Sequence, residues 1–306
     1  MNKLNNYFMK PTYLRDLAIY PIKLMEYENF KLLANQFLLL DIPQLNNKRK
    51  QERLPKLEQD NLFDYLIALI EENKNKINEM SRQIKQVRSL PKEVIKKQIE
   101  ENPELQGFID NLDLLEQLYS KSMEEQLCEL ISMTVKKKVT FINGIYKAFV
   151  IYDIDEKIGE EKIKWVINKD NFYDYRKIVM EQNCLFTPRI SSNKRSQEIL
   201  DREAKKIFGD EESSLESIVA FVSLEYAGKD ISEYTYYRAM ADYKMAIKKL
   251  GYFASTIYRA NGCKTKGDKE IEIPNLSEDL GMLDNPFNKL LRQAKETELD
   301  KKLSNR

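Results

Sequence analysis

The segment that decides the fold is YYRAMADYKMAIKKLGYFASTI, which runs from Tyr236 to Ile257. Its apolar side chains recur at intervals of 4, 3, 4, 3, 4 and 3, at Tyr236, Met240, Tyr243, Ile247, Leu250, Ala254 and Ile257. This spacing aligns them along one stripe of an α-helix, like the a and d positions of a coiled coil. We therefore predict a long helix, capped by Ser232, which Gly251 can weaken or bend because glycine has a low helix propensity.

The same stripe supplies the candidate protein-interaction residues, which are Tyr236, Met240, Tyr243, Ile247 and Leu250. Aromatic and methionine side chains are enriched at protein interfaces. A stripe with this spacing more often packs within its own chain, and the sequence leaves both alternatives open.

More helices are predicted on the C-terminal side of the chain. They are residues 172–182 after the capping residue Asp170, residues 193–208 before Gly209, a helix opened by a capping box at Ser213, and a charged helix from Pro286.

The N-terminal part is also predicted to be mainly helical. Tyr27 to Leu40 places Tyr27, Phe30, Leu33 and Phe37 on one helix face, and Pro43 is expected to close this helix. A surface loop is predicted at Lys48–Lys56, then a helix capped by Asp60, and later a helical pattern from Leu105 to Val135.

A small antiparallel sheet is predicted in the middle of the chain. Asn143-Gly144 separates two runs of β-forming residues, 139–142 and 145–152, and this dipeptide favours a type I′ hairpin turn. Residues 163–167 are a plausible third strand. The predicted fold class is therefore mainly α (α+β). It comprises a helical region at 1–136, the sheet at 137–168 and a helical domain at 169–306.

The composition removes several classes of chemistry. The chain has no histidine, so it cannot contain a Ser-His-Asp triad, a Cys-His pair or a histidine-ligated zinc site. Its 50 basic and 49 acidic residues nearly cancel, whereas nucleic-acid binders usually carry a basic excess. A nucleic-acid partner is therefore unlikely.

The three cysteines, Cys128, Cys184 and Cys263, are far apart and odd in number, so free thiols in a reducing compartment are expected. The N-terminus is polar, and no apolar run approaches the roughly 20 residues of a membrane span. These features predict a soluble cytoplasmic protein with no membrane partner.

Motifs for catalysis or ligand binding are weak. There is no phosphate-binding GxxxxGK[ST] loop, and the calcium-loop-like start at Asp153 has Ile158 where glycine is required. The basic clusters Lys136-Lys137-Lys138 and Lys264-Thr265-Lys266 are best interpreted as solvated edges. We therefore expect no enzymatic activity, no cofactor and no metal site.

Four segments, taken in order, resemble proteins encoded in the tail modules of phages of Gram-positive bacteria. They are DNFYDYRKIVMEQN at 170–183, FTPR at 186–189, DISEYTYY at 230–237 and LGMLDNPF at 280–287, with the helix capped at Ser213 between the second and third. The resemblance covers roughly the last 140 residues, and none of its motifs is catalytic.

This resemblance implies a tail-assembly chaperone that binds a helical client such as the tape-measure protein. Its partners would be other phage tail proteins, and self-association is compatible with the apolar stripe. It would act in the host cell cytoplasm. The alternative is a structural minor tail or baseplate component that remains in the virion tail. A nucleic-acid-binding protein is the third hypothesis.

Overall fold

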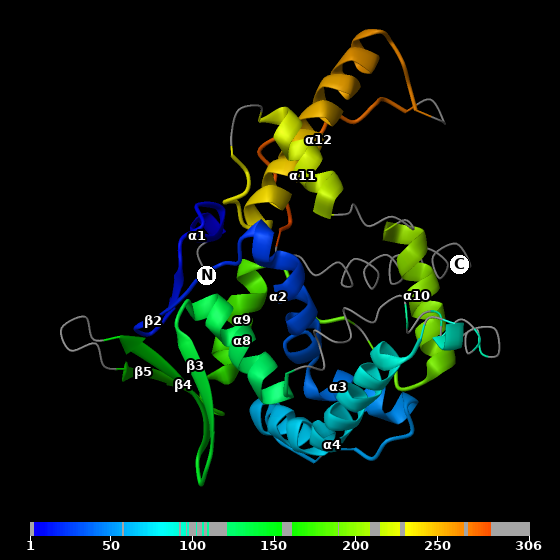
Figure 1. Cartoon of the computed structure of the whole chain (residues 1–306). Coiled ribbons are helices and arrows are strands. Elements are labelled where there is room, and N and C mark those ends of the chain that lie inside the picture. The colour runs from blue at the N-terminus through cyan, green and yellow to red at the C-terminus, as the bar shows by residue number, and fades with distance from the viewer. Residues whose placement is uncertain are drawn as a thin grey trace, which may run out of the picture. The chain divides into compact units, whose positions relative to one another are not determined.

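The computed structural model describes residues 3–56, 58–91, 121–154, 161–188, 190–208, 215–226, 230–265 and 269–282, with a few positions between 93 and 109. In this part of the chain, helices predominate and two small antiparallel sheets accompany them, which confirms the predicted fold class. The chain forms two compact units (Figure 1). Unit 1 contains residues 1–56 and 176–306, and unit 2 contains residues 57–175.

These units cut across the three predicted regions. The predicted regions follow the type of secondary structure along the chain, whereas unit 1 joins the two ends of the chain. The boundary on the C-terminal side lies within helix α9 (Phe172–Gln182), whose bounds match the predicted helix.

The described part of unit 2 contains helices α4 (Leu62–Ser89) and α8 (Met123–Val135), the start of α9 and a three-stranded sheet. Helices α4 and α8 pack together, and α8 also packs on strand β3 (Lys138–Asn143). Strand β4 (Lys147–Ile154) lies between β3 and β5 (Glu161–Ile167), so the sheet order is β3-β4-β5.

Aromatic side chains from α4, β4 and the first turn of α9 pack in the core of unit 2. The ring of Phe63 on α4 lies 5.9 Å from that of Phe149 on β4 and 5.7 Å from that of Phe172 on α9. Tyr175 is fully buried, and its hydroxyl lies 2.6 Å from the Thr134 hydroxyl on α8. The hydrogen bond satisfies both buried groups, as a core of this kind requires.

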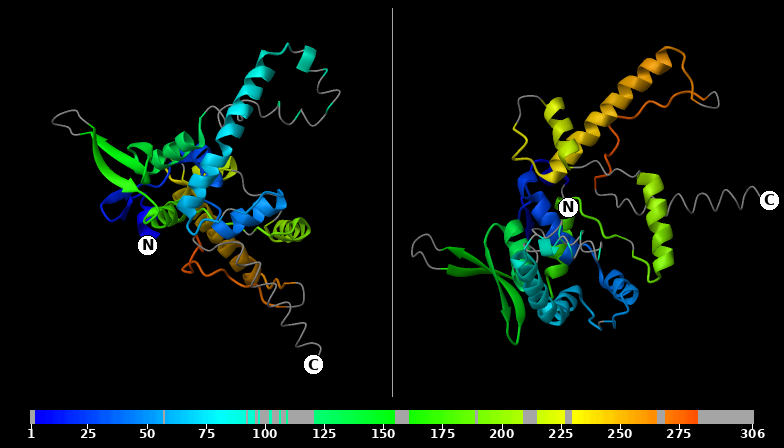
Figure 2. Two further views of the ribbon diagram at one scale, coloured as in Figure 1. Left: turned by 90° about the horizontal axis from the view of Figure 1, so that it is seen from below. Right: turned by 45° about the vertical axis from the view of Figure 1, so that its right-hand side comes forward.

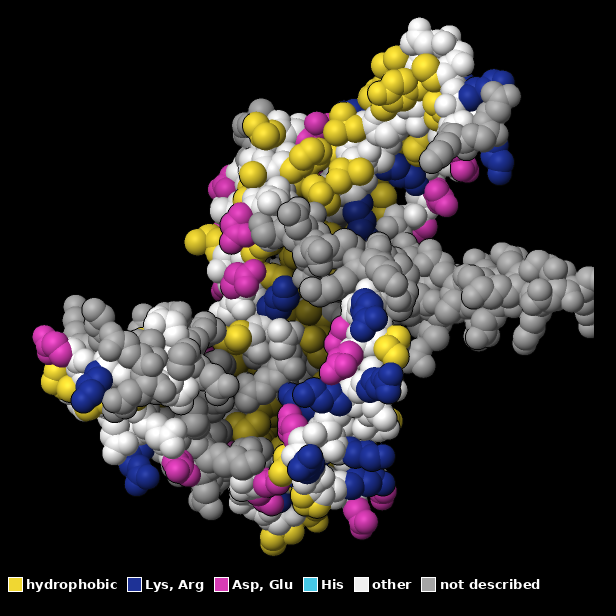
Figure 3. Space-filling model, turned by 90° about the vertical axis from the view of Figure 1, so that its right-hand side faces the viewer, with side chains coloured by type: hydrophobic (Ala, Val, Ile, Leu, Met, Phe, Trp, Pro, Cys, Tyr) yellow, Lys and Arg dark blue, Asp and Glu magenta, His cyan; other side chains and the backbone are white. Residues whose placement is uncertain are grey.

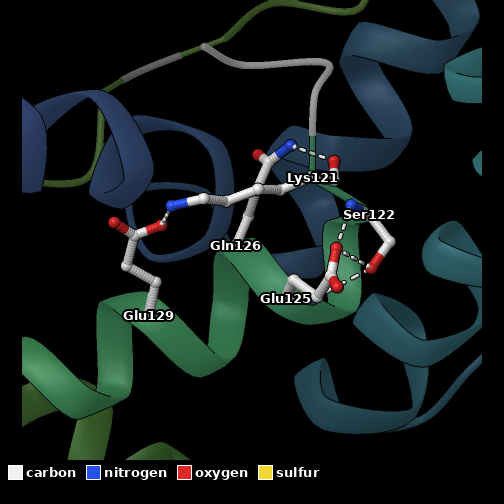
Figure 4. A network of polar contacts seen from close by, with 5 residues as sticks. All are labelled: Lys121, Ser122, Glu125, Gln126 and Glu129. Carbon is white, nitrogen blue, oxygen red and sulfur yellow. Dashed lines mark hydrogen bonds and ion pairs between the residues drawn. The ribbon is translucent and has the colours of Figure 1, made fainter. Parts of the chain in front are cut away.

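A capping box starts α8, although the sequence analysis did not use it. The Ser122 hydroxyl accepts a hydrogen bond from the Glu125 backbone N–H, and the Glu125 carboxylate accepts one from the Ser122 N–H (Figure 4). Lys121 adds an ion pair with Glu129, and the Gln126 side chain donates to the Lys121 carbonyl. This network satisfies backbone groups that have no partner within the helix.

The predicted β-hairpin and third strand are confirmed, but the turn differs from type I′. Asn143 pairs with Lys147, so the connecting loop contains three residues, Gly144, Ile145 and Tyr146. Gly144 does not have the positive φ that a type I′ turn requires. Asn143 belongs to the strand because its pairing extends the ladder by one residue.

Unit 1 begins with helix α1 (Lys3–Tyr7) and a hairpin of β1 (Thr12–Leu14) and β2 (Leu17–Ile19). Helix α2 (Leu24–Phe37) buries the face predicted for it, namely Tyr27, Phe30, Leu33 and Phe37. The other described helices of unit 1 are α3 (Ile42–Gln51), the rest of α9, α10 (Lys194–Phe208), α11 (Leu215–Glu225) and α12 (Tyr236–Ala260).

Two predictions near α3 are wrong. Pro43 lies in the first turn of this helix rather than closing the previous one, because proline in a first helical turn gives up no required hydrogen bond. Residues 48–51 belong to α3 and not to the predicted loop. Arg49 is buried there, and its Nε donates to the Pro55 carbonyl at 2.6 Å.

Two predicted caps are displaced. Asn61, rather than Asp60, caps α4 by accepting a hydrogen bond from the Asp64 N–H. Thr235, rather than Ser232, caps α12. The second shift has a tertiary cause, because Thr235 forms a β-bridge with Lys23 and the Tyr234 carbonyl accepts from the Leu24 N–H. The predicted caps at Gly209 and Ser213 and the helix from Pro286 lie outside the described residues.

Buried polar side chains at the end of α9 hold the N-terminal segment of unit 1 in place. The Asn183 Oδ1 accepts from the Ile22 N–H at 3.0 Å, and its Nδ2 donates to the Val179 carbonyl. Gln182 donates to the Ile19 carbonyl at 2.9 Å. The Arg176 guanidinium donates to the Leu38 carbonyl and forms an ion pair with Asp41 at 2.8 Å.

We expect Asn183→Ala to lower the free energy of unfolding by about 2 kcal/mol, because it leaves the buried Ile22 N–H without an acceptor. Urea denaturation followed by circular dichroism measures this change. Asn35→Ala is the matched control, since Asn35 is exposed on α2 in the same unit. Equal stability of the two variants would contradict the assigned role of Asn183.

Candidate protein-interaction surface

Helix α12 is continuous from Tyr236 to Ala260, and Gly251 does not interrupt it. In Figure 1 and Figure 2 it extends past the end of α11, and the chain that follows returns beside it. The returning chain contacts one side of α12: Lys248 pairs with Glu278 at 3.5 Å, and Pro274 lies beside Gly251.

The base of α12 is anchored by a buried charge network. The Tyr7 hydroxyl donates to the Asp242 carboxylate at 3.0 Å, and the Arg238 Nε lies 3.3 Å from the same carboxylate. The Arg238 guanidinium also lies over the rings of Tyr7 and Tyr234, 4.3 and 4.9 Å from their centroids. Burial and the neighbouring Asp242 carboxylate raise the pKa of Tyr7, which therefore stays protonated as the donor.

The first three predicted interaction residues belong to the core of unit 1. Tyr236, Met240 and Tyr243 are partly buried against a cluster that includes Leu24, Ile218 and Val222. The Tyr236 ring stacks on that of Tyr27 at 4.1 Å. The Tyr243 ring meets that of Phe221 edge-on at 5.3 Å.

The other two predicted residues are exposed. Ile247 is 45% exposed and Leu250 is 53% exposed. The stripe continues with the exposed Ala254 and with Ile257, which is 60% exposed. The cause is length: α11 has 11 residues and α12 has 25, so α11 covers only the first part of the stripe.

Two aromatic side chains widen this exposed stripe, namely Phe253 (52% exposed) and Tyr258 (57% exposed). We refer to Ile247, Leu250, Phe253, Ala254, Ile257 and Tyr258 as the distal face of α12. Hydrophobic side chains gather over this part of the molecule in Figure 3. The sequence analysis missed the two aromatic residues because they stand beside the stripe. The short length of the helix that precedes α12 could have indicated that the end of α12 is left uncovered.

Charged groups lie beside the distal face rather than on it. Lys249 pairs with Glu225 at 2.8 Å, and Arg259 pairs with Glu270 at 2.6 Å. The positions flanking the stripe are Ala246, Gly251, Phe253 and Tyr258, none of which is charged. A partner can therefore cover the face without desolvating an ion, which is the costly step in burying charged surface.

The basic clusters are engaged locally. Lys137 pairs with Asp153 at 2.7 Å, and Lys138 pairs with Glu161 at 2.7 Å. Lys264 forms a β-bridge with Glu270. The two ion pairs offset part of the positive charge of the first cluster, whereas the bridge at Lys264 joins backbone groups.

A hollow of about 530 Å³ lies beside α3 in unit 1. It is lined by Ile42, Pro43, Asn46, Asn47, Lys50, Leu54 and Lys56. The lining contains amide and ammonium groups but neither a carboxylate nor a thiol, so it offers no acid–base or nucleophile–base pair.

The remaining searches concern only the residues that the structure describes. Within them, no group of three or more His, Cys, Asp or Glu side chains could hold a metal ion. None of the described helices has the length and apolar character to cross a bilayer. Comparison of the chain with protein-family models, with curated proteins and with solved structures gave no match.

Two of the three thiols are protected by burial. Burial raises the pKa of the Cys128 thiol to about 11 and that of the Cys184 thiol to about 12. Cys263 is exposed. A protonated thiol is a poor nucleophile, so the buried cysteines are unreactive near neutral pH.

We expect one thiol, Cys263, to react rapidly with an aromatic disulfide reagent at pH 7.5, and all three to react after unfolding. The raised pKa values also set a pH dependence, because the unfolded thiols ionise near 9. The contribution of the protonated Cys128 and Cys184 thiols to the free energy of unfolding is complete below pH 9 and is lost as the pH rises from 9 towards 12. Rapid reaction of Cys128 or Cys184 in the native protein would contradict the assigned burial.

Gly251 gives a second prediction. A Cβ at this position would lie 3.7 Å from the Pro274 Cγ, which is an ordinary van der Waals contact. Gly251→Ala should therefore stabilise α12 by about 0.5–1 kcal/mol through helix propensity alone. A thermal melt followed by circular dichroism measures the gain. Gly262→Ala is the control, since Gly262 has a φ of +70° and should lose stability instead.

Proposed function

We propose that this chain is a non-enzymatic protein-binding factor that covers an apolar helix of a client with the distal face of α12. The observation that carries the proposal is the exposure of this face on a helix whose base is fixed in the core. Five large side chains are about half exposed there, at Ile247, Leu250, Phe253, Ile257 and Tyr258. Single exposed apolar residues are ordinary, whereas a contiguous group of them indicates an interaction site.

The geometry suits a helical client. Ile247, Leu250, Ala254 and Ile257 stand at i, i+3, i+7 and i+10, which is the spacing by which one helix packs along another. The uncharged flanks favour an apolar client and do not impose a charge pattern on it. Burying apolar surface of this kind gives about 25 cal/mol per Å², so affinity comes from covering the face.

The resemblance to phage tail modules supplies the biological setting. We propose that the chain is a tail-assembly chaperone, active in the host cell cytoplasm, and that its client is a long helical tail protein such as the tape-measure protein. Two of the resembling segments coincide with helices of the structure: residues 170–183 include α9, and residues 230–237 lead into α12, the helix that carries the distal face. A holding function of this kind needs an apolar face and no titrating group.

Co-expression with the tape-measure protein of the same tail module tests the proposal. The unaltered chain should increase the soluble fraction of the client, and Leu250→Asp should abolish most of this increase, because it places a charge at the centre of the distal face. Met25→Asp is the matched control: Met25 is exposed on α2, in the same unit but not on α12. Client solubility that is independent of the chain would overturn the chaperone function.

Mass spectrometry of particles and infected-cell lysate separates a chaperone from a structural component. A chaperone should be present in the lysate and absent from purified particles. Presence in particles at fixed copy number would instead establish a minor tail or baseplate protein.

A further inference from the structure

We propose that two copies of this chain associate through the distal face, with their α12 helices packed antiparallel. The inference goes beyond the proposed function, because self-association needs no client and gives the exposed face an occupant when no client is present. It rests on the pattern of large and small side chains along the face.

The pattern is symmetric about Tyr252. Ile247 and Ile257 lie five residues on either side of it, and Leu250 and Ala254 lie two residues on either side. When two such helices cross antiparallel at this point, Leu250 of one copy meets Ala254 of the other, twice. Ile247 of one copy meets Ile257 of the other. Pairing a large side chain with a small one fills the space between helices without voids or overlap.

A parallel arrangement lacks this fit. Leu250 would then face its own copy, which crowds the interface, and Ala254 would face its own copy, which leaves a void. The antiparallel arrangement also separates the nearest cations, because Lys249 of one copy comes level with Ser255 of the other and not with a second Lys249. Size and charge therefore select the same orientation.

The size of the face sets the expected strength. A fully covered aromatic side chain buries 150–250 Å², and Ile and Leu bury less, so the five half-exposed residues offer at most on the order of 100 Å² each, or at most about 500 Å² per copy. A standard interface buries about 800 Å² per partner. We therefore expect a weak dimer, with a dissociation constant in the micromolar range.

Sedimentation equilibrium of the full chain tests the association, at protein concentrations from about 1 to 100 µM to span the expected constant. The unaltered protein should shift from monomer to dimer over this range. Leu250→Asp should raise the dissociation constant at least about tenfold, as expected for a central interface residue. Met25→Asp should leave it unchanged. Unaltered circular dichroism of both variants confirms that they fold.

Disulfide cross-linking tests the orientation. Leu250→Cys and Ala254→Cys are prepared separately in a Cys263→Ser background, so that the exposed native thiol does not interfere. Mild oxidation of a mixture should link Leu250→Cys of one copy to Ala254→Cys of the other. Neither variant should link efficiently to itself. Self-linking of both variants without the mixed product would establish a parallel pair and overturn the antiparallel arrangement.

Two outcomes would overturn the association itself. One is a monomer at every concentration, in which case a client remains as the occupant of the face. The other is a dimer that Leu250→Asp does not weaken, which would place the contact elsewhere. Neither outcome affects the client test, because that test measures the solubility of a different protein.

Discussion

The structure of unit 1 depends on the buried polar side chains at the end of α9. Arg176, Gln182 and Asn183 satisfy backbone groups of Leu38, Ile19 and Ile22, which the chain reaches only after closing a loop of more than a hundred residues. A buried amide or carbonyl without such a partner would cost free energy comparable to that of the hydrogen bond itself. These contacts therefore select one register for the N-terminal segment, where apolar burial alone would tolerate several. Once α2 is fixed in this register, its side chains and backbone form the surface on which the first turns of α12 pack.

The position of the first turns of α12 depends on this register, because residues of the α2 region contact them directly. Tyr27 stacks on Tyr236, the Leu24 N–H donates to the Tyr234 carbonyl, and Lys23 forms an ion pair with Glu233. Tyr7 adds its hydrogen bond to Asp242 from α1. The helix is therefore held firmly at one end, while its other end extends beyond α11. The stripe therefore changes its environment along a single helix: its first half packs in the core of unit 1, and its second half leaves apolar side chains exposed.

The sequence predicted the type and the approximate bounds of the helices and strands better than it predicted which of their faces are buried. The periodic stripe, the bounds of α9, the buried face of α2 and the order of the central strands follow from local patterns, and all are present. The capping box at Ser122 was equally readable. The sequence does not predict the residue at which the stripe of α12 changes from buried to exposed. That point depends on contacts such as Lys23 with Glu233, 210 residues apart, and on where α11 ends. The same long-range pairing moves the cap of α12 from Ser232 to Thr235.

The absence of charge at the positions flanking the stripe of Ile247, Leu250, Ala254 and Ile257 bears on both proposed occupants. In coiled coils these positions set partner choice and orientation through ion pairs. Here Ala246, Gly251, Phe253 and Tyr258 leave shape as the source of selectivity, and shape discriminates less sharply than unpaired charge does. Such a face accepts many apolar helices weakly, which suits a holding factor whose client must later leave. The symmetric arrangement of Leu250 and Ala254 gives a second copy only a modest advantage. Under these proposals, a client helix that covers more apolar surface than a second copy does would displace it from the face.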